Sequence, residues 1–155
     1  MKKAGLLFFS VVVTLVTLSC LSSLGTVWDD SVPPGESAKI AFVFFEPASY
    51  NQIAVNKKDF RVVTVPAGAA EFAGELVYTT VAGNLMQEFH AKGAVFSCVL
   101  EAGKEYWAWG GYTDNEEETV RTWGIRFYED KIKGLGPGKG TLVGFIPFDP
   151  PITSR

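Results

Sequence analysis

The sequence predicts an all-β protein, a single antiparallel β-sandwich of about eight strands. Short apolar runs recur at roughly 8–12-residue spacing with turn residues between them, and no segment shows a clear helical pattern. Residues 40–45 are apolar on both faces, whereas residues 71–79 alternate between apolar and polar side chains. Two packed sheets with central and half-exposed strands explain both patterns. A small closed β-barrel is the alternative architecture.

The strands are expected in regular succession along the chain. Residues 37–46 predict a central strand that ends at Pro47. A β-hairpin is expected at residues 96–110, where two strand-like runs flank a turn at Gly103. Residues 81–92 fit a short helix or a strand, with a slight preference for the strand. The remaining strands are expected at residues 50–55, 60–65, 71–79, 119–128 and 141–146.

Residues 1–19 predict a signal peptide. Lys2 and Lys3 precede an uncharged apolar run, which is short for a membrane-spanning helix of about 20 apolar residues. Cys20 directly follows this run and a small residue, Ser19. The arrangement resembles the lipobox of bacterial lipoproteins, in which the cysteine becomes the diacylated first residue, although Thr17 stands where the usual pattern has Leu.

This resemblance implies lipidation at Cys20 and a membrane anchor in the bacterial cell envelope, either periplasmic or at the cell surface. The alternative is ordinary cleavage after Gly25, which produces a secreted domain. Residues 20–36 are rich in Ser, Gly and Pro and are expected to form a lipidated tether. Residues 37–148 are then the β-sandwich domain, and residues 149–155 a C-terminal tail.

Two turns carry an internal repeat. Residues 63–72 and 99–106 both read as strand, Ala-Gly, strand with an aromatic residue. This sequence pattern resembles the turns of bacterial surface β-sandwich modules of the transthyretin-like and PEGA type. Together with the lipobox, it makes the chain similar to small spirochaete-type lipoproteins of unassigned function. The resemblance implies no catalytic residues.

Composition restricts the function further. The formal net charge of −3 provides no positive surface for nucleic acid. The chain has 2 cysteines, so lipidation of Cys20 leaves Cys98 alone and excludes an intramolecular disulfide. Cys98 shares a strand face with Phe96 and Leu100, and it is expected to be a buried small hydrophobe and not a nucleophile.

The sequence contains no recognisable catalytic set. His90 is the only histidine, and no Gly-x-Ser-x-Gly motif accompanies it. Glu71 and Glu75 share one face of a strand, but glycosidases draw their carboxylates from separate elements across a cleft, so this pair indicates solubility. We therefore predict that the protein is not an enzyme and has no cofactor.

Two loops have features in common with known ligand sites. Residues 114–118 offer oxygen ligands to calcium, but they lack EF-hand spacing and are typical of a solvated hairpin tip. Residues 133–141 are similar to a phosphate-binding loop but are one residue short, have Gly140 after the lysine and precede a strand. Zinc needs more histidine and cysteine ligands than the chain supplies. No metal site is predicted.

An aromatic cluster begins at Tyr106. Alternation places Trp107 and Trp109 on one face and Tyr106 and Tyr112 on the other. Large aromatic side chains usually fill the core of β proteins, so we favour the interpretation that the aromatic residues of this cluster are core residues. Exposed rings can instead stack against sugars, in which case Trp107, Trp109 and Arg126 are the candidate ligand-binding residues.

These observations predict a lipid-anchored cell-envelope protein that acts as a non-catalytic binding or structural module. Its expected partners are the membrane, through the anchor, and a protein or carbohydrate ligand. Two alternatives remain open: a carbohydrate- or small-ligand-binding module that uses exposed aromatic residues, and a free secreted β-sandwich domain.

Overall fold

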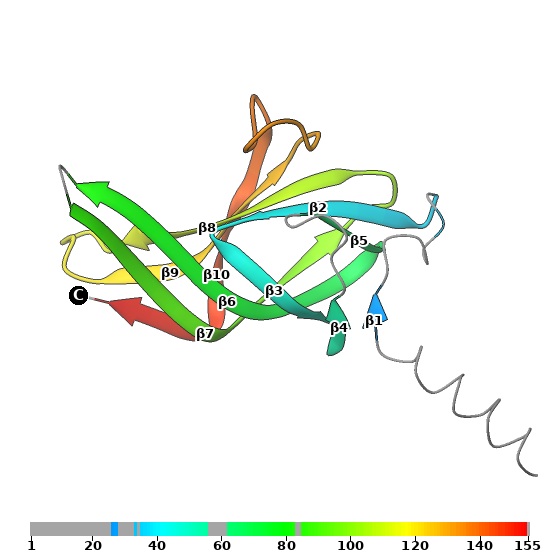
Figure 1. The fold of residues 1–155 in the computed structure, drawn as a ribbon. Helices are drawn as coiled ribbons and strands as arrows, with labels where there is room; N and C mark the ends of the chain where they lie inside the picture. The colour runs from blue at the N-terminus through cyan, green and yellow to red at the C-terminus, as the bar shows by residue number, and fades with distance from the viewer. Residues whose placement is uncertain (1–25, 28–32, 34, 56–61, 83–84, 155) are drawn as a thin grey trace, which may run out of the picture.

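Two β-sheets packed face to face form the protein (Figure 1). The computed structural model describes residues 26–27, 33, 35–55, 62–82 and 85–154, and all regular structure in these residues is β-strand. The first sheet has the strand order β1 (Thr26–Val27), β4 (Ile53–Val55), β3 (Phe45–Tyr50), β6 (Gly68–Ala82), β7 (Leu85–Leu100). The second has the order β10 (Thr141–Ser154), β9 (Arg121–Glu129), β8 (Glu105–Asp114), β2 (Ser37–Val43), β5 (Val62–Pro66).

The predicted β-sandwich is confirmed. Each sheet ends at two edge strands, so neither sheet is closed into the alternative barrel. Most neighbouring strands are antiparallel, but β2 pairs with β8 in parallel, and the short β1 pairs with β4 in parallel. The parallel pair at the centre of the second sheet arises because β2 and β8 are far apart in the sequence and are not joined by a turn.

The predicted hairpin at residues 96–110 is wrong. β7 and β8 lie in different sheets and are not paired with each other. A short turn with glycine can fold two strands into one sheet or carry the chain from one sheet to the other. Here the Gly103 N–H donates to the Ser37 carbonyl oxygen at 2.8 Å, which ties the turn to β2 in the second sheet.

The segment expected as one strand at residues 37–46 consists of two. Phe44, with a φ of 58°, takes the chain from β2 in the second sheet to β3 in the first. Pro47 does not end the strand, because it lies at a register shift inside β3, where a missing N–H is tolerated. Asn51 and Gln52 also have positive φ and form a turn, so the strand expected at residues 50–55 begins only at Ile53.

Two long strands extend beyond their expected limits. In the ambiguous segment, residues 81–82 and 85–92 belong to strands, and β6 and β7 form a hairpin paired from Gly68 and Leu100 to Ala82 and Leu85. β10 continues past Ile146, where the sequence predicts the last strand to end, and residues 152–154 pair with β9 after a register shift.

Aromatic side chains dominate the space between the sheets. Phe72 has no exposed surface, and its ring centroid lies 5.3 Å from that of Phe42 on the other sheet and 5.4 Å from that of Phe96. Phe45 and Phe148 stack at 5.9 Å and join β3 to β10. Each such buried side chain contributes about 1.5–3 kcal/mol by leaving water.

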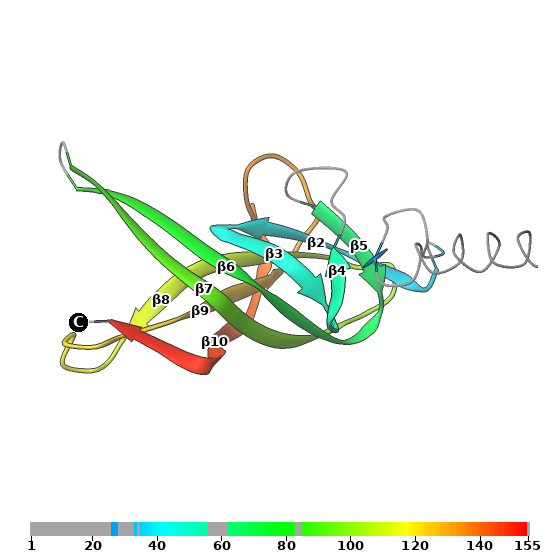
Figure 2. The same ribbon diagram turned by 60° about the horizontal axis from the view of Figure 1, so that its bottom comes forward.

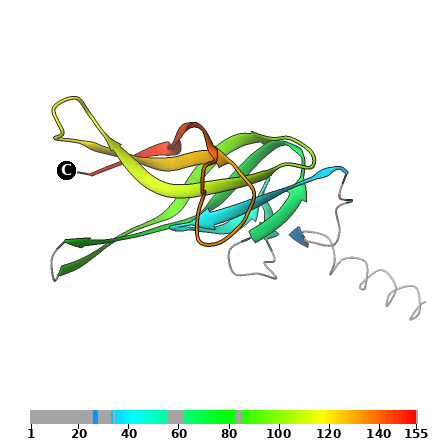
Figure 3. The same cartoon turned by 90° about the horizontal axis from the view of Figure 1, so that it is seen from above.

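The sandwich has two distinct ends. β1 lies at one end, whereas the tip of the β6–β7 hairpin, the β8–β9 turn and the C-terminal end of β10 lie together at the other (Figures 1 and 2). Seen from above, the β6–β7 tip and the β8–β9 turn diverge at this second end (Figure 3). We call it the distal end, because it is remote from the N-terminal strand.

Candidate functional site

A cleft of about 390 Å³ opens at the distal end between the two sheets. We call it the distal cleft. Its walls come from both sheets, which bring four aromatic residues together with hydroxyl, amide and charged residues. It is lined by Tyr78, Thr80, Gln87, Glu88, Phe89, Tyr112, Arg121, Trp123 and Ser154.

Strand alternation explains why these residues meet. On β9, Arg121 and Trp123 follow the same period of two as the buried Ile125, so all three face the space between the sheets. On the opposite hairpin, Tyr78 is directly across from Phe89 on the inward face of β6 and β7. The sheets diverge beyond these residues, and the inward face therefore becomes accessible.

The aromatic side chains form one packed group. Phe89 and Trp123 stack in parallel, with centroids 4.0 Å apart and planes 5° apart. Tyr78 and Tyr112 approach Trp123 edge-on at 5.3 Å and 5.1 Å. Trp123 Nε1 donates a hydrogen bond to Ser154 Oγ at 2.9 Å. These contacts hold the four rings in defined positions relative to one another.

Arg121 provides the positive charge at the mouth of the distal cleft. Its guanidinium lies 4.4 Å from the centroid of the Tyr112 ring, and its Nε is 3.3 Å from Asp114 Oδ1. Its side chain is half exposed. Among the described residues, no acceptor engages its two terminal nitrogens, so these N–H groups can donate to a ligand oxygen.

The structure separates the three aromatic-cluster residues predicted as ligand contacts. Trp107 is 2% exposed on the outer face of the second sheet, and its Nε1 donates to the Lys131 carbonyl oxygen at 3.3 Å. Trp109 and Arg126 are direct partners across β8 and β9, on that same face. Arg126 donates to the Tyr112 carbonyl oxygen at 2.8 Å. Trp109 and Arg126 are therefore neighbours, but the Trp107 ring is not accessible for stacking.

The glycine-rich segment expected to be a turn is the cover over these tryptophans. A Cβ on Gly136 would lie 2.6 Å from the Trp109 ring, which shows how closely this segment packs. The Gly138 N–H donates to Asp130 Oδ2 at 2.9 Å. Because this N–H already donates to a carboxylate, it is not available to bind a phosphate, and the segment is a turn.

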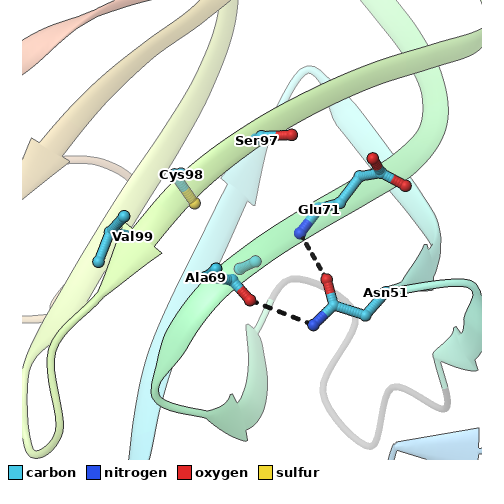
Figure 4. A pocket seen from close by; sticks show the side chains of 7 residues that line it. Asn51, Ala69, Glu71, Ser97, Cys98 and Val99 are labelled. Carbon is cyan, nitrogen blue, oxygen red and sulfur yellow. Dashed lines mark hydrogen bonds between the residues drawn. The ribbon is translucent and has the colours of Figure 1, made fainter.

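Cys98 lines a second, smaller pocket on β6 and β7, of about 320 Å³ (Figure 4). The Asn51 side-chain amide is used internally: Asn51 Nδ2 donates to the Ala69 carbonyl oxygen at 3.2 Å, and the Glu71 N–H donates to Asn51 Oδ1 at 2.8 Å (Figure 4). Burial raises the pKa of the Cys98 thiol to about 12. The thiol is therefore neutral at physiological pH and is a poor nucleophile.

His90 lies on the outer face of the first sheet. Its Nδ1 is 3.3 Å from Glu75 Oε1 and its Nε2 is 3.4 Å from Glu88 Oε2. Hydrogen bonds to Glu88 and then to Glu75 raise the pKa of His90. The imidazole lies between the Glu75 and Glu88 carboxylates, each of which contacts a different ring nitrogen, so the two carboxylates do not converge on one position. In the described ranges, no three His, Cys, Asp or Glu side chains are placed to hold a metal ion.

The acidic loop after β8 is an ordered turn. Asn115 Oδ1 accepts hydrogen bonds from the N–H groups of Thr119 at 2.8 Å and Val120 at 3.0 Å. This side chain is therefore occupied by the turn itself.

The predicted lipidation residue, Cys20, lies outside the described residues. Within those residues, no helix is long and apolar enough to cross a bilayer. Comparisons with protein-family models, with characterised proteins and with solved structures gave no match to this chain.

The residues of the distal cleft were not predicted as a site. Alternation places Arg121 and Trp123 on one face, and this was the signal that could have found half of the cleft. Nothing in the sequence indicates that Tyr78 and Phe89, on a different sheet, close the other side.

Proposed function

We propose that the protein is a lipid-anchored, non-catalytic binding module of the bacterial cell envelope, and that its ligand is a carbohydrate or a similarly small amphipathic molecule held in the distal cleft. The observation that carries this proposal is the meeting of three partly exposed aromatic rings, Tyr78, Phe89 and Tyr112, with Arg121 and neutral polar groups in one concave site, where the buried Trp123 packs behind the rings.

The size of the distal cleft supports binding. Small-molecule sites are commonly clefts of about 300–1,000 Å³. The distal cleft lies within that range at about 390 Å³. The partly exposed rings of Tyr78, Phe89 and Tyr112 can pack against the apolar faces of a sugar. Arg121, Thr80 and Gln87 offer hydrogen-bonding groups to its hydroxyls.

The position of the cleft agrees with an anchor at Cys20. The chain from Cys20 to Thr26 reaches at most about 20 Å, so an acylated Cys20 keeps the β1 end close to the membrane. The distal cleft is lined by residues near the tip of the β6–β7 hairpin and the β8–β9 turn, and these lie at the end opposite β1 (Figure 1). It is therefore presented away from the anchoring bilayer, where a soluble or surface-bound ligand can enter.

The absence of catalysis is part of the proposal. The distal cleft has one carboxylate residue in its lining, Glu88, on a β7 position that alternates with the inward Phe89 and Gln87. His90 and Cys98 lie elsewhere, and burial keeps the Cys98 thiol protonated. These groups do not converge on a shared reacting atom.

Paired arginine variants on one strand test the binding site. Soluble mono- to trisaccharides are titrated into the purified protein, and tryptophan fluorescence is followed. With a sugar that binds, Arg121→Ala is expected to weaken the affinity for that sugar by about tenfold or more, because a charge-assisted hydrogen bond is lost. Arg126→Ala, five residues along the same strand but on the outer face, is expected to leave affinity unchanged.

The opposite effect of the two variants would place the binding site elsewhere. If Arg126→Ala abolishes binding and Arg121→Ala does not, the ligand binds at Trp109 on the outer face. If no sugar shifts the fluorescence of the protein, the carbohydrate assignment fails.

The anchor is tested separately by intact mass of the protein from its native membrane. A mass equal to residues 20–155 plus a triacylated cysteine is expected. A mass that corresponds to cleavage after Gly25 without lipid would leave a secreted binding domain.

A further inference from the structure

The tip of the β6–β7 hairpin exposes large aliphatic side chains. Val81, Leu85 and Met86 are 69%, 68% and 67% exposed. Val81 is directly across from Met86, so both lie on the outer face, whereas Leu85 follows the inward face of the hairpin. Together these three side chains form what we call the hairpin tip.

The hairpin tip extends beyond the rest of its sheet. β3 pairs with β6 only as far as Leu76, the Val77 N–H donates to the Phe44 carbonyl oxygen at 2.9 Å, and beyond Val77 β6 pairs only with β7. Past the residues that line the distal cleft, the ends of the two strands project from the sandwich (Figures 1 and 2). No charged residue occurs from Thr79 to Gln87.

These features exclude a conventional protein interface as the main role. A side chain of this size buries on the order of 60–120 Å² of apolar surface, so three bury about 180–360 Å². A stable protein–protein interface needs about 800 Å² from each partner. A narrow convex tip without charges is suited instead to a fluid apolar phase, which adapts to its shape.

We propose that the hairpin tip inserts into a lipid bilayer, at the level where headgroups meet acyl chains. The interaction is apolar and not electrostatic, because the tip has no charge and the whole chain is acidic, with a net charge of −3. Since the hairpin tip is at the distal end, on a protein anchored at Cys20 it faces away from the anchoring bilayer and meets a facing one.

Vesicle flotation tests this directly. The mature chain, residues 20–155, carries Cys20→Ser so that no acyl chain contributes, and it is mixed with phosphatidylcholine vesicles. Binding is expected, with little dependence on salt. The double variant Val81→Thr/Met86→Gln is expected to reduce the partition coefficient at least tenfold while the melting temperature is unchanged. Both substituted side chains lie on the face away from the distal cleft.

Val99 supplies a matched control on the same strand. It is 70% exposed but lies at the opposite end of β7, across from Ala69. Val99→Thr is expected to leave partitioning within about twofold of the unsubstituted chain.

Three results would overturn the proposal: no partitioning of the unsubstituted chain, an equal loss with Val99→Thr, or a dimer in sedimentation that the double variant dissociates, which would assign the tip to a second copy of the chain. None of these depends on sugar binding at the distal cleft, so the two proposals fail independently.

Discussion

Gly110→Ala tests the point at which the chain changes sheets. Gly110 is buried on the inward face of β8, beneath Phe44, the residue that joins β2 to β3. A Cβ at this position would lie 2.6 Å from Leu76 Cδ1 and 2.8 Å from the Phe44 carbonyl oxygen. Ordinary contacts are about 3.4–4 Å, so the crossing has to move by several tenths of an ångström or more.

The expected loss of stability is large for a single methyl group. Overpacking a dense core costs about 1–3 kcal/mol, and the upper end applies because the Phe44 backbone cannot rotate away as a side chain can. Removal of about 3 kcal/mol corresponds to a melting temperature lower by about 10 °C for a domain of this size.

Gly144→Ala is the matched control. Gly144 also lies in a strand, has no positive φ, and a Cβ there would meet no heavy atom within 4 Å. Its free energy of unfolding is expected to change by less than about 0.5 kcal/mol. Urea unfolding of both variants is followed by tryptophan fluorescence. Equal stability of the two variants would show that the crossing at Phe44 does not pack against Gly110.

Three further predictions concern single side chains. The native Cys98 thiol is expected to react with Ellman's reagent at pH 8 at least tenfold more slowly than in urea, and equal rates would contradict its burial. The free energy of unfolding should fall as pH rises from about 9 to 12, because the unfolded chain loses the thiol proton at a lower pH than the folded chain. The pKa of His90, followed by NMR, is expected above 6.5 and should drop in Glu88→Gln; its small stabilising effect is present below pH 6.5 and disappears as pH rises through the raised pKa. Asn115→Ala is expected to cost about 1 kcal/mol in urea unfolding, because two backbone N–H groups lose their acceptor; no change would mean that water replaces the side chain at no cost.

Local patterns were sufficient for the fold class and for the faces of the regular strands. The alternation at residues 71–79 correctly places Phe72 and Leu76 in the core, because the two faces of a strand differ in contact with water over every pair of residues. The same period of two puts Trp123, Ile125 and Phe127 together on one face of β9, and the structure shows that this face is buried. These inferences need only the nearest neighbours along the chain.

The two Ala-Gly turns mark the limit of such inferences. The sequence shows that residues 63–72 and 99–106 are alike, and the structure shows that both carry the chain between sheets, from β5 to β6 and from β7 to β8. A turn has the same residues whether the next strand pairs with the last one or crosses to the facing sheet. The inward side chains are apolar in both cases, so the pattern cannot distinguish them.

What the sequence by itself determined is the fold class, the faces of its regular strands and the lack of a recognisable catalytic motif. Only the tertiary structure decided which aromatic residues are covered and which line a cleft. Trp107 is on an outer face, yet the segment that includes Gly136 and Lys131 covers that face. Trp123 meets Phe89 across two sheets, at 4.0 Å. Both outcomes depend on contacts between residues distant in sequence, and period-two alternation carries no information about those contacts.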